Sequence, residues 1–292
     1  MSAGWETIAP VRALGIDVSV RRGLDLVLLN EASAILETHR RVQPGELGAI
    51  LKAVEPDVVA IDSPPEWGRS GGSRLTEKEL RRFGIQSYGT PPQKKADNAF
   101  YAWMRVGMKA FEAAGVAGFA RYRNGSVRGY AIEVFPHASA VVLAECLPPK
   151  ALPKHVWRRS ILKAHDVSAD ELRSADQVDA ALAALTGLLA LRGRFTALGD
   201  PVEGCIVIPA RTLPPVPYRR CVEPPADELQ PHLPGLAPCG CGDPDCTELT
   251  RREFAPGHDA KRKSALWRQA RLGDEAVLEL RRRGWELPPE LR

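Results

Sequence analysis

Acidic residues interrupt or follow several apolar segments of the chain. One acid lies in the middle of the strand-like run 13–19, and another directly follows the run 57–61. A third lies in the run 130–135, and two share one face of the apolar helix expected at 175–191 because they are three residues apart. Burying an unpaired carboxylate is costly, so such acids pair with a cation, reach solvent or bind metal. The candidate catalytic residues are therefore Asp17, Asp62, Glu133, Asp176 and Asp179.

Each of these acids also has a structural explanation that needs no active site. Asp17 could point to solvent from an alternating strand or cap the turn at Ser19. Asp176 and Asp179 could simply complement the dipole at the helix N-terminus. Glu133 could form a salt bridge with Arg81, Lys154 or Arg158.

Basic residues are unevenly distributed, although the formal net charge is only +4. Residues 69–109 contain nine basic and three acidic side chains, and residues 121–163 contain eight basic and two acidic ones. Both stretches lie between the candidate catalytic acids, so they could contact nucleic-acid phosphates, although each also fits a solvated helix face. The candidate phosphate-contacting residues are Arg81, Arg82, Lys94, Lys95, Lys154 and Arg158.

The apolar patterning predicts an α/β protein. Two successive hairpins come first, and an amphipathic helix then leads to a continuously apolar strand typical of parallel sheets. The Gly-rich residues 67–92 are expected to form an insertion over the carboxyl edge of the sheet. We expect strands at 11–20, 24–30, 34–42, 57–61, 130–135 and 205–209, and helices at 46–54, 75–83, 98–114, 137–146, 154–164 and 175–191.

This order of elements, with acids on the first strand, after the fourth strand and on a late helix, resembles the ribonuclease H-like fold, a mixed sheet with flanking helices. The resemblance implies that Asp17 and Asp62 face each other across a gap that the late helix closes. Carboxylates converging there would repel one another unless cations neutralised them, and Mg²⁺ or Mn²⁺ suits such oxygen ligands. The resemblance thus implies metal-dependent hydrolysis of phosphodiester bonds in DNA or RNA, with Asp17, Asp62 and Asp179 holding the metal.

Five short motifs in order resemble those of the domain of unknown function 429 family, whose members are regarded as predicted nucleases. The resemblance covers about residues 11–209 and adds Glu133 to the implied metal ligands. The chain departs from the family at residues 81–84, where members often carry Arg-Xaa-Cys-Asp, so no cysteine role is carried over. The motifs are Gly15-Ile16-Asp17, Ile61-Asp62-Ser63-Pro64, Glu133-Val134-Phe135-Pro136, Asp176-Gln177-Val178-Asp179-Ala180, and Gly199-Asp200 with Glu203-Gly204-Cys205-Ile206-Val207-Ile208-Pro209.

Two other classes of function remain open. Nucleotide-binding proteins of the actin or sugar-kinase type also begin with a Gly-Xaa-Asp strand. They repeat that unit and add a second Gly-rich phosphate loop, and this chain shows neither. The third class is a non-catalytic module that binds nucleic acid or protein, which carboxylates too far apart to share a metal would favour.

The C-terminal part carries a separate metal-binding signal. Three thiolates and an imidazole are enough for a closed tetrahedral zinc site. A module this small buries little apolar surface by itself, so it needs a bound metal ion for stability. The proline-rich residues 211–238 predict a linker between a domain at 1–210 and a zinc-binding helical module at 239–292. The zinc ligand candidates are Cys239, Cys241, Cys246 and His258, with Cys221 or His232 as a substitute.

The composition predicts a cytoplasmic protein without membrane contact. No apolar run reaches the ~18 residues needed to cross a bilayer, and the N-terminus lacks the pattern of a secretion signal. The six cysteines do not suggest a disulfide framework, because Cys146, Cys205 and Cys221 are scattered. The crowding of the other three at 239–246 instead indicates a metal site in a reducing compartment. The pattern does not indicate protein partners or an oligomeric state.

Overall fold

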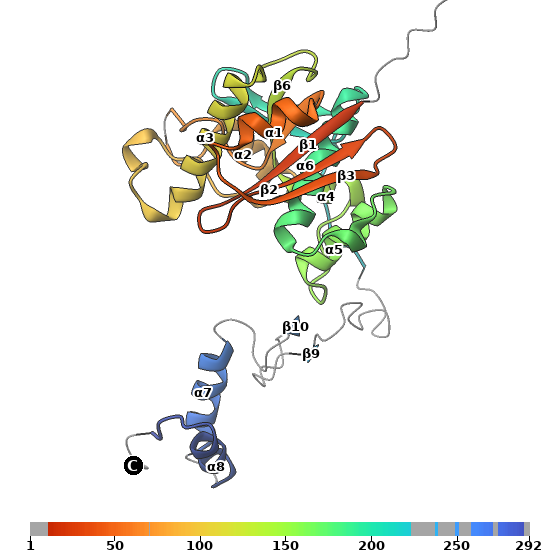
Figure 1. Cartoon of the computed structure of the whole chain (residues 1–292). Coiled ribbons are helices and arrows are strands. Elements are labelled where there is room, and N and C mark those ends of the chain that lie inside the picture. Colours follow the sequence, from red (N-terminus) through yellow and green to blue (C-terminus); the bar gives the residue numbers. More distant parts are fainter. Residues whose placement is uncertain are drawn as a thin grey trace, which may run out of the picture. The chain divides into compact units, whose positions relative to one another are not determined.

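An eight-stranded mixed sheet runs through the described part of the first of two structural units (Figure 1). The computed structural model describes residues 11–69, 71–222, 237–238, 249–250, 258–270 and 274–288. The first unit comprises Met1–Pro148 and Lys154–Cys221, and the second comprises Pro149–Pro153 and Val222–Arg292.

The first half of the sheet is antiparallel and begins as the sequence predicts. β1 (Arg12–Ser19), β2 (Gly23–Asn30) and β3 (Ile35–Val42) pair in succession. The helix α1 (Leu47–Val54) then crosses to β4 (Val58–Ile61), which pairs parallel to β1. The predicted mixed sheet, antiparallel first and then parallel, is therefore confirmed.

The remaining strands extend the sheet on the other side of β4, in the order β3-β2-β1-β4-β6-β8-β7, with β5 paired to β6. The predicted strands at 130–135 and 205–209 correspond to β6 and β8, each paired parallel to its neighbour. The bounds are β5 Ala120–Arg121, β6 Tyr130–Val134, β7 Thr196–Asp200 and β8 Gly204–Ile208.

The strand β7 was not expected from the sequence. It pairs antiparallel with β8 along its whole length and forms the edge of the sheet. Its residues are mostly half-exposed and include Gly199 and Asp200, so it lacks the continuous apolar run that identified β4.

Helices cover both faces of the sheet (Figure 1). On one face, α1 and α3 pack over Leu14, Ile16 and Ile61 in a single apolar core. On the other face, α6 lies across β1, β2 and β4 and contacts α4 and α5. The remaining helix bounds are α2 Leu75–Arg82, α3 Ala102–Val116, α4 Pro136–Ala144, α5 Lys154–Ala164 and α6 Ala175–Leu191, with short 3-10 turns at Gln93–Lys95, Ala99–Tyr101 and Ala169–Glu171.

Cys146 and Cys221 form a disulfide, which corrects the expectation that these scattered cysteines stay unpaired. The two residues are 75 positions apart in sequence, so their spacing gave no sign of the bond. Backbone pairing between Leu147 and Arg220 brings them together, with their α-carbons 5.1 Å apart. Cys221 is consequently not a spare zinc ligand in this structure.

The described part of the second unit contains two short strands and two helices. β9 (Ala237–Pro238) pairs with β10 (Leu249–Thr250). α7 (His258–Gln269) and α8 (Asp274–Arg282) pack through a small apolar cluster of Leu266, Ala270, Ala276 and Leu280.

Among the described residues, none of the helices has the length and apolar character required to traverse a membrane.

Candidate active site

A close approach between strand β1 and helix α6 sets the geometry of the candidate site. A β-carbon placed on Gly15 would lie 1.9 Å from the carbonyl oxygen of Ala180 and 2.3 Å from the amide nitrogen of Ala184. Further along the helix, a β-carbon on Gly187 would lie 3.3 Å from that of Ala13. The helix therefore runs antiparallel to β1, and the backbones can touch only because residue 15 is glycine.

This packing register points the carboxylate of Asp17 toward the first turns of α6. Side chains alternate along a strand, so Asp17 projects from the same face as Ala13 and Gly15. Because residue 15 meets Ala180 and Ala184, residue 17 lies one helical turn nearer the N-terminus of α6, where Asp176 and Asp179 are.

Asp62 lies beside Asp17 because β1 and β4 run parallel. Ile16 pairs with Ile61, and the amide of Asp62 donates a hydrogen bond to the carbonyl oxygen of Ile16 at 2.9 Å. The resemblance to the ribonuclease H-like fold implied this pairing of the first and fourth strands, and the structure brings the two acids to the same edge of the sheet.

Burial and mutual repulsion dominate the electrostatics of this edge. Burial raises the pKa of Asp17 well above its ordinary value, and the charged groups acting on Asp17 are all aspartates, led by Asp62 and then Asp179. Burial and then the charge of Asp179 likewise raise the pKa of Asp62, with Arg158 opposing them. Ionised carboxylates are thus unfavourable here unless a cation joins them.

Two of the helix acids have basic partners. Both carboxylate oxygens of Asp179 accept hydrogen bonds from one guanidinium nitrogen of Arg158, at 2.6 and 2.5 Å. Burial still raises the pKa of Asp179, with Arg158 opposing it. Asp176 forms an ion pair with Arg22 at 2.8 Å. Arg158, a candidate for phosphate contact, is therefore already bound to Asp179 in this structure.

Within the described residues, no three His, Cys, Asp or Glu side chains lie close enough to hold a metal ion together. The carboxylates at this edge are hard oxygen donors of the kind that Mg²⁺ and Mn²⁺ prefer. Asp17 and Asp62 fit such an ion as a pair, whereas Asp179 could join them only by releasing Arg158.

Glu133 belongs to a different group of side chains. It pairs with Ile61 across β4 and β6, so it shares the face of Ile61 rather than that of Asp17. Its two carboxylate oxygens bind the guanidinium of Arg74 at 2.8 and 2.5 Å. Arg81, Lys154 and Arg158, the partners considered from the sequence, do not hold it. The link to Arg74 spans 59 residues and joins β6 to the residue before α2, which no local pattern indicates.

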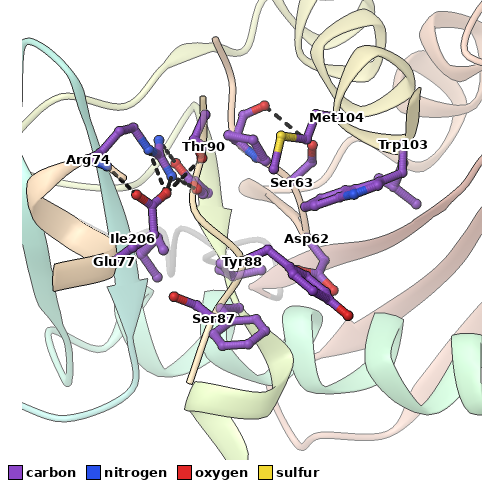
Figure 2. A pocket seen from close by; sticks show the side chains of 15 residues that line it. Asp62, Ser63, Arg74, Glu77, Ser87, Tyr88, Thr90, Trp103, Met104 and Ile206 are labelled. Atoms are coloured by element: carbon purple, nitrogen blue, oxygen red, sulfur yellow. Dashed lines mark hydrogen bonds and ion pairs between the residues drawn. The ribbon is translucent and has the colours of Figure 1, made fainter. Parts of the chain in front are cut away.

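Arg74 organises a buried network of hydrogen bonds (Figure 2). Its Nε donates to Glu77 at 2.8 Å, and the hydroxyl of Thr90 donates to the same carboxylate at 2.7 Å. Burial by itself would lower the pKa of Arg74, but Glu133 and Glu77 more than offset it and raise that pKa. The network ties β6, α2 and the segment before Pro91 together as one charged but satisfied unit.

A cavity of about 290 Å³ lies between this network and Asp62. Figure 2 shows Arg74 and Glu77 on one side of it, and Asp62, Tyr88 and Trp103 on the other. Phe135 and Met104 complete an apolar wall. No sequence pattern indicates this cavity, because its aromatic residues come from separate segments, one of them in the Gly-rich insertion.

The candidate phosphate-contacting residues are dispersed. Arg81 donates to the hydroxyl of Ser73 at 2.5 Å, and Arg82 is exposed at the end of α2. Lys94 and Lys95 are exposed and line a second cavity of about 950 Å³ with Trp67 and Arg69. Lys154 is exposed at the start of α5. Burial, then Arg158 and Lys154, lower the pKa of His137 to about 3.

The zinc prediction falls largely outside the described residues. Cys239, Cys241, Cys246 and His232 are not among them, and the side chain of His258 is not described at the start of α7. The zinc site stays a prediction.

The chain was also compared with known proteins. No curated protein and no solved structure matches it. The family model described as "Protein of unknown function (DUF429)" matches residues 15–204, which span β1 to the start of β8 and include every candidate acid of the first unit. The chain belongs to the domain of unknown function 429 family.

Proposed function

We propose that the first unit is a nuclease that hydrolyses phosphodiester bonds with Mg²⁺ or Mn²⁺, and that its sheet is a ribonuclease H-like one. The observation that supports this most is the pair Asp17 and Asp62, two adjacent buried acids whose pKa values are both raised, that of Asp17 by burial and then by the charge of Asp62. A protein loses stability by keeping such a pair without a cation, so the pair is best explained by a bound metal ion.

The topology supports the fold assignment. A three-stranded antiparallel sheet comes first, and β4, β6 and β8 then add in parallel, with α6 over the strands that carry the acids. These features agree with the ribonuclease H-like expectation without requiring Glu133 as a ligand.

Asp17 and Asp62 would hold the ion, and Asp179 would join them after exchanging Arg158. A divalent ion at such carboxylates activates a water molecule and stabilises the charge that develops on the phosphate. The chain itself would supply the orientation. Gly15 lets α6 approach, α6 presents Asp179, and Arg158 could bind a phosphate once Asp179 is released.

A second candidate function has one observation in its favour. The Arg158–Asp179 ion pair already neutralises one of the acids, so this acid can have a structural role without a metal ion. Such a role is what a non-catalytic nucleic-acid-binding module would require. For the C-terminal part, we propose zinc binding by Cys239, Cys241, Cys246 and His258, which metal analysis of the purified full chain against Cys239→Ser would test.

The decisive experiment is a nuclease assay on single-stranded and duplex DNA and RNA with Mn²⁺, Mg²⁺ or chelator. Asp17→Asn and Asp62→Asn should each lower the rate at least about 100-fold. Asp57→Asn is the matched control, because Asp57 lies just before β4, at its other end, and binds Arg128 and the amide of Arg12. Metal-dependent cleavage that survives both site substitutions would reject the assignment of the site, and no cleavage with any metal would favour the binding module.

A further inference from the structure

The cavity beside Asp62 has the composition of a site for one flat ring. Its wall is formed by Tyr88, Trp103, Phe135 and Met104, with Asp62 at its margin. Its volume of about 290 Å³ lies just below the range for small-molecule pockets, ~300–1,000 Å³, and suits a single heterocycle.

The aromatic side chains at this cavity are held ready for stacking. The rings of Tyr88 and Trp103 lie 6.5 Å apart at 57°, and Tyr88 meets Phe100 edge-on at 5.3 Å. Tyr88 nevertheless exposes 66% of its surface, although burying a ring of that size is favourable. A planar ligand that stacks on it would bury that surface.

Polar groups at the cavity could read the edge of such a ring. Ser87 lines the cavity, and its buried hydroxyl has no hydrogen-bond partner among the residues that the structure describes. Burying an unpaired hydroxyl is unfavourable, so a ligand that pairs with it gains affinity. Ser87 and Tyr88 are held in position because Thr90, two residues further on, donates to Glu77 in the buried Arg74 network.

A basic cleft continues along the same pair of chain segments. The amide of Gly68 donates to the carbonyl oxygen of Pro91 at 3.0 Å, and Gly68 pairs with Pro92, so the segments after Ser63 and after Ser87 run together. Past this contact the two segments line the cavity of about 950 Å³ that carries Arg69, Lys94 and Lys95. An aromatic slot followed by cations suits a base followed by its phosphates.

We propose that the cavity lined by Tyr88 and Trp103 binds one unstacked base of a single-stranded nucleic acid, and that the adjoining phosphates lie on Arg69, Lys94 and Lys95. This inference rests on the proposed nuclease function and specifies its substrate as a single strand. A base in the cavity brings its phosphate next to Asp62, whereas bases stacked within a duplex cannot enter.

Equilibrium binding without divalent ions tests the inference. Fluorescence anisotropy with the full chain in chelator would compare a labelled single strand, a duplex of the same sequence, and a mononucleotide as competitor. The single strand should bind at least about ten-fold more tightly than the duplex, and the mononucleotide should compete only weakly. Equal affinity for strand and duplex, or a mononucleotide as effective as the strand, would overturn the proposal.

Variants locate the binding. Tyr88→Leu and Trp103→Leu should each weaken strand binding at least about five-fold, because each removes a stacking surface. Tyr130→Leu is the matched control, since Tyr130 is also an exposed tyrosine but lies at the start of β6, away from the cavity. Lys94→Gln should reduce the dependence of log affinity on log salt by about 0.7. Unchanged affinity in both aromatic variants would reject the base site.

These readouts separate the inference from the proposed function. Strand binding that depends on Tyr88, without cleavage under any metal, would leave the base site standing and reject the nuclease. If Tyr88→Leu and Trp103→Leu instead cleave with metal at the native rate and bind the strand with the native affinity, the nuclease proposal stands and the base site is rejected.

Discussion

Gly15 in β1 lies against the carbonyl oxygen of Ala180 in α6, so closely that a β-carbon on residue 15 would approach it to 1.9 Å. This contact sets how far α6 sits from the sheet and hence where Asp179 lies relative to Asp17. It links the packing of the fold to the geometry of the proposed site.

Gly15→Ala should lower the free energy of unfolding by ~3 kcal/mol, because either the helix or the strand must shift to admit a methyl group. Urea denaturation of the full chain measures the change. Gly48→Ala in α1 is the matched control, since nothing lies within 4 Å of the added carbon, and it should be neutral or stabilise by up to ~1 kcal/mol. Equal effects of the two substitutions would argue against the close approach.

Glu133→Gln should destabilise the protein by ~3–5 kcal/mol, because it leaves the buried guanidinium of Arg74 without a full counter-charge. Thermal or urea melting would detect this loss. Glu37→Gln, which removes an exposed partner of His39, should change stability by less than ~0.5 kcal/mol. If Glu133→Gln melts like the native chain, the Arg74 network does not hold the fold together.

The disulfide between Cys146 and Cys221 should stabilise the first unit by up to ~4 kcal/mol, since it closes a loop with a sequence separation of 75. Adding a thiol reductant should therefore lower the melting temperature of the native chain. The double variant Cys146→Ser with Cys221→Ser should melt at that lower temperature with or without reductant. A native chain insensitive to reductant would contradict the bond.

Asp17→Asn and Asp62→Asn should each stabilise the metal-free protein at neutral pH by ~1 kcal/mol, or about 2–4 °C in melting temperature. The reason is that burial and the neighbouring acids raise the pKa of both residues, so ionising them costs more in the folded chain than in the unfolded one.

The stability that the two Asn substitutions add should depend on pH, because it reflects the ionisation of Asp17 and Asp62. A raised folded pKa adds stability below the ordinary value of 3.8, and that contribution is lost as the pH rises through the folded pKa. The Asn variants should therefore exceed the native chain near pH 7 and lose that advantage near pH 4. Melting curves in chelator across this range measure it, and a native chain that is more stable at pH 7 would contradict the repulsion.

Several features could be predicted from the sequence because they depend on local patterns. The apolar run ending at Ile61 marked a parallel strand, whereas the position of Asp62 beside Asp17 was expected only from the resemblance to the ribonuclease H-like fold. The helix bounds of α5 and α6 follow their apolar periodicity. The edge strand β7 was missed because edge strands need no apolar run.

Other features depend on contacts between distant segments. Arg74 binds Glu133 across 59 residues, and Cys146 bonds to Cys221 across 75. No local sequence pattern indicates contacts between residues so far apart. The ion pair of Arg158 with Asp179 could be suspected only from charge. The aromatic wall combines Tyr88 from a loop with Trp103 from α3, so no periodicity joins them.

Calorimetric titration with Mn²⁺ tests the central claim most directly, namely that Asp17 and Asp62 together hold a catalytic metal ion. Titrated in parallel, the native chain and Asp57→Asn should show the same binding, whereas Asp17→Asn and Asp62→Asn should each weaken one site at least about ten-fold. Using the full chain keeps any metal bound by the second unit equal in all four titrations. Identical isotherms for the native chain and both site variants would contradict the account.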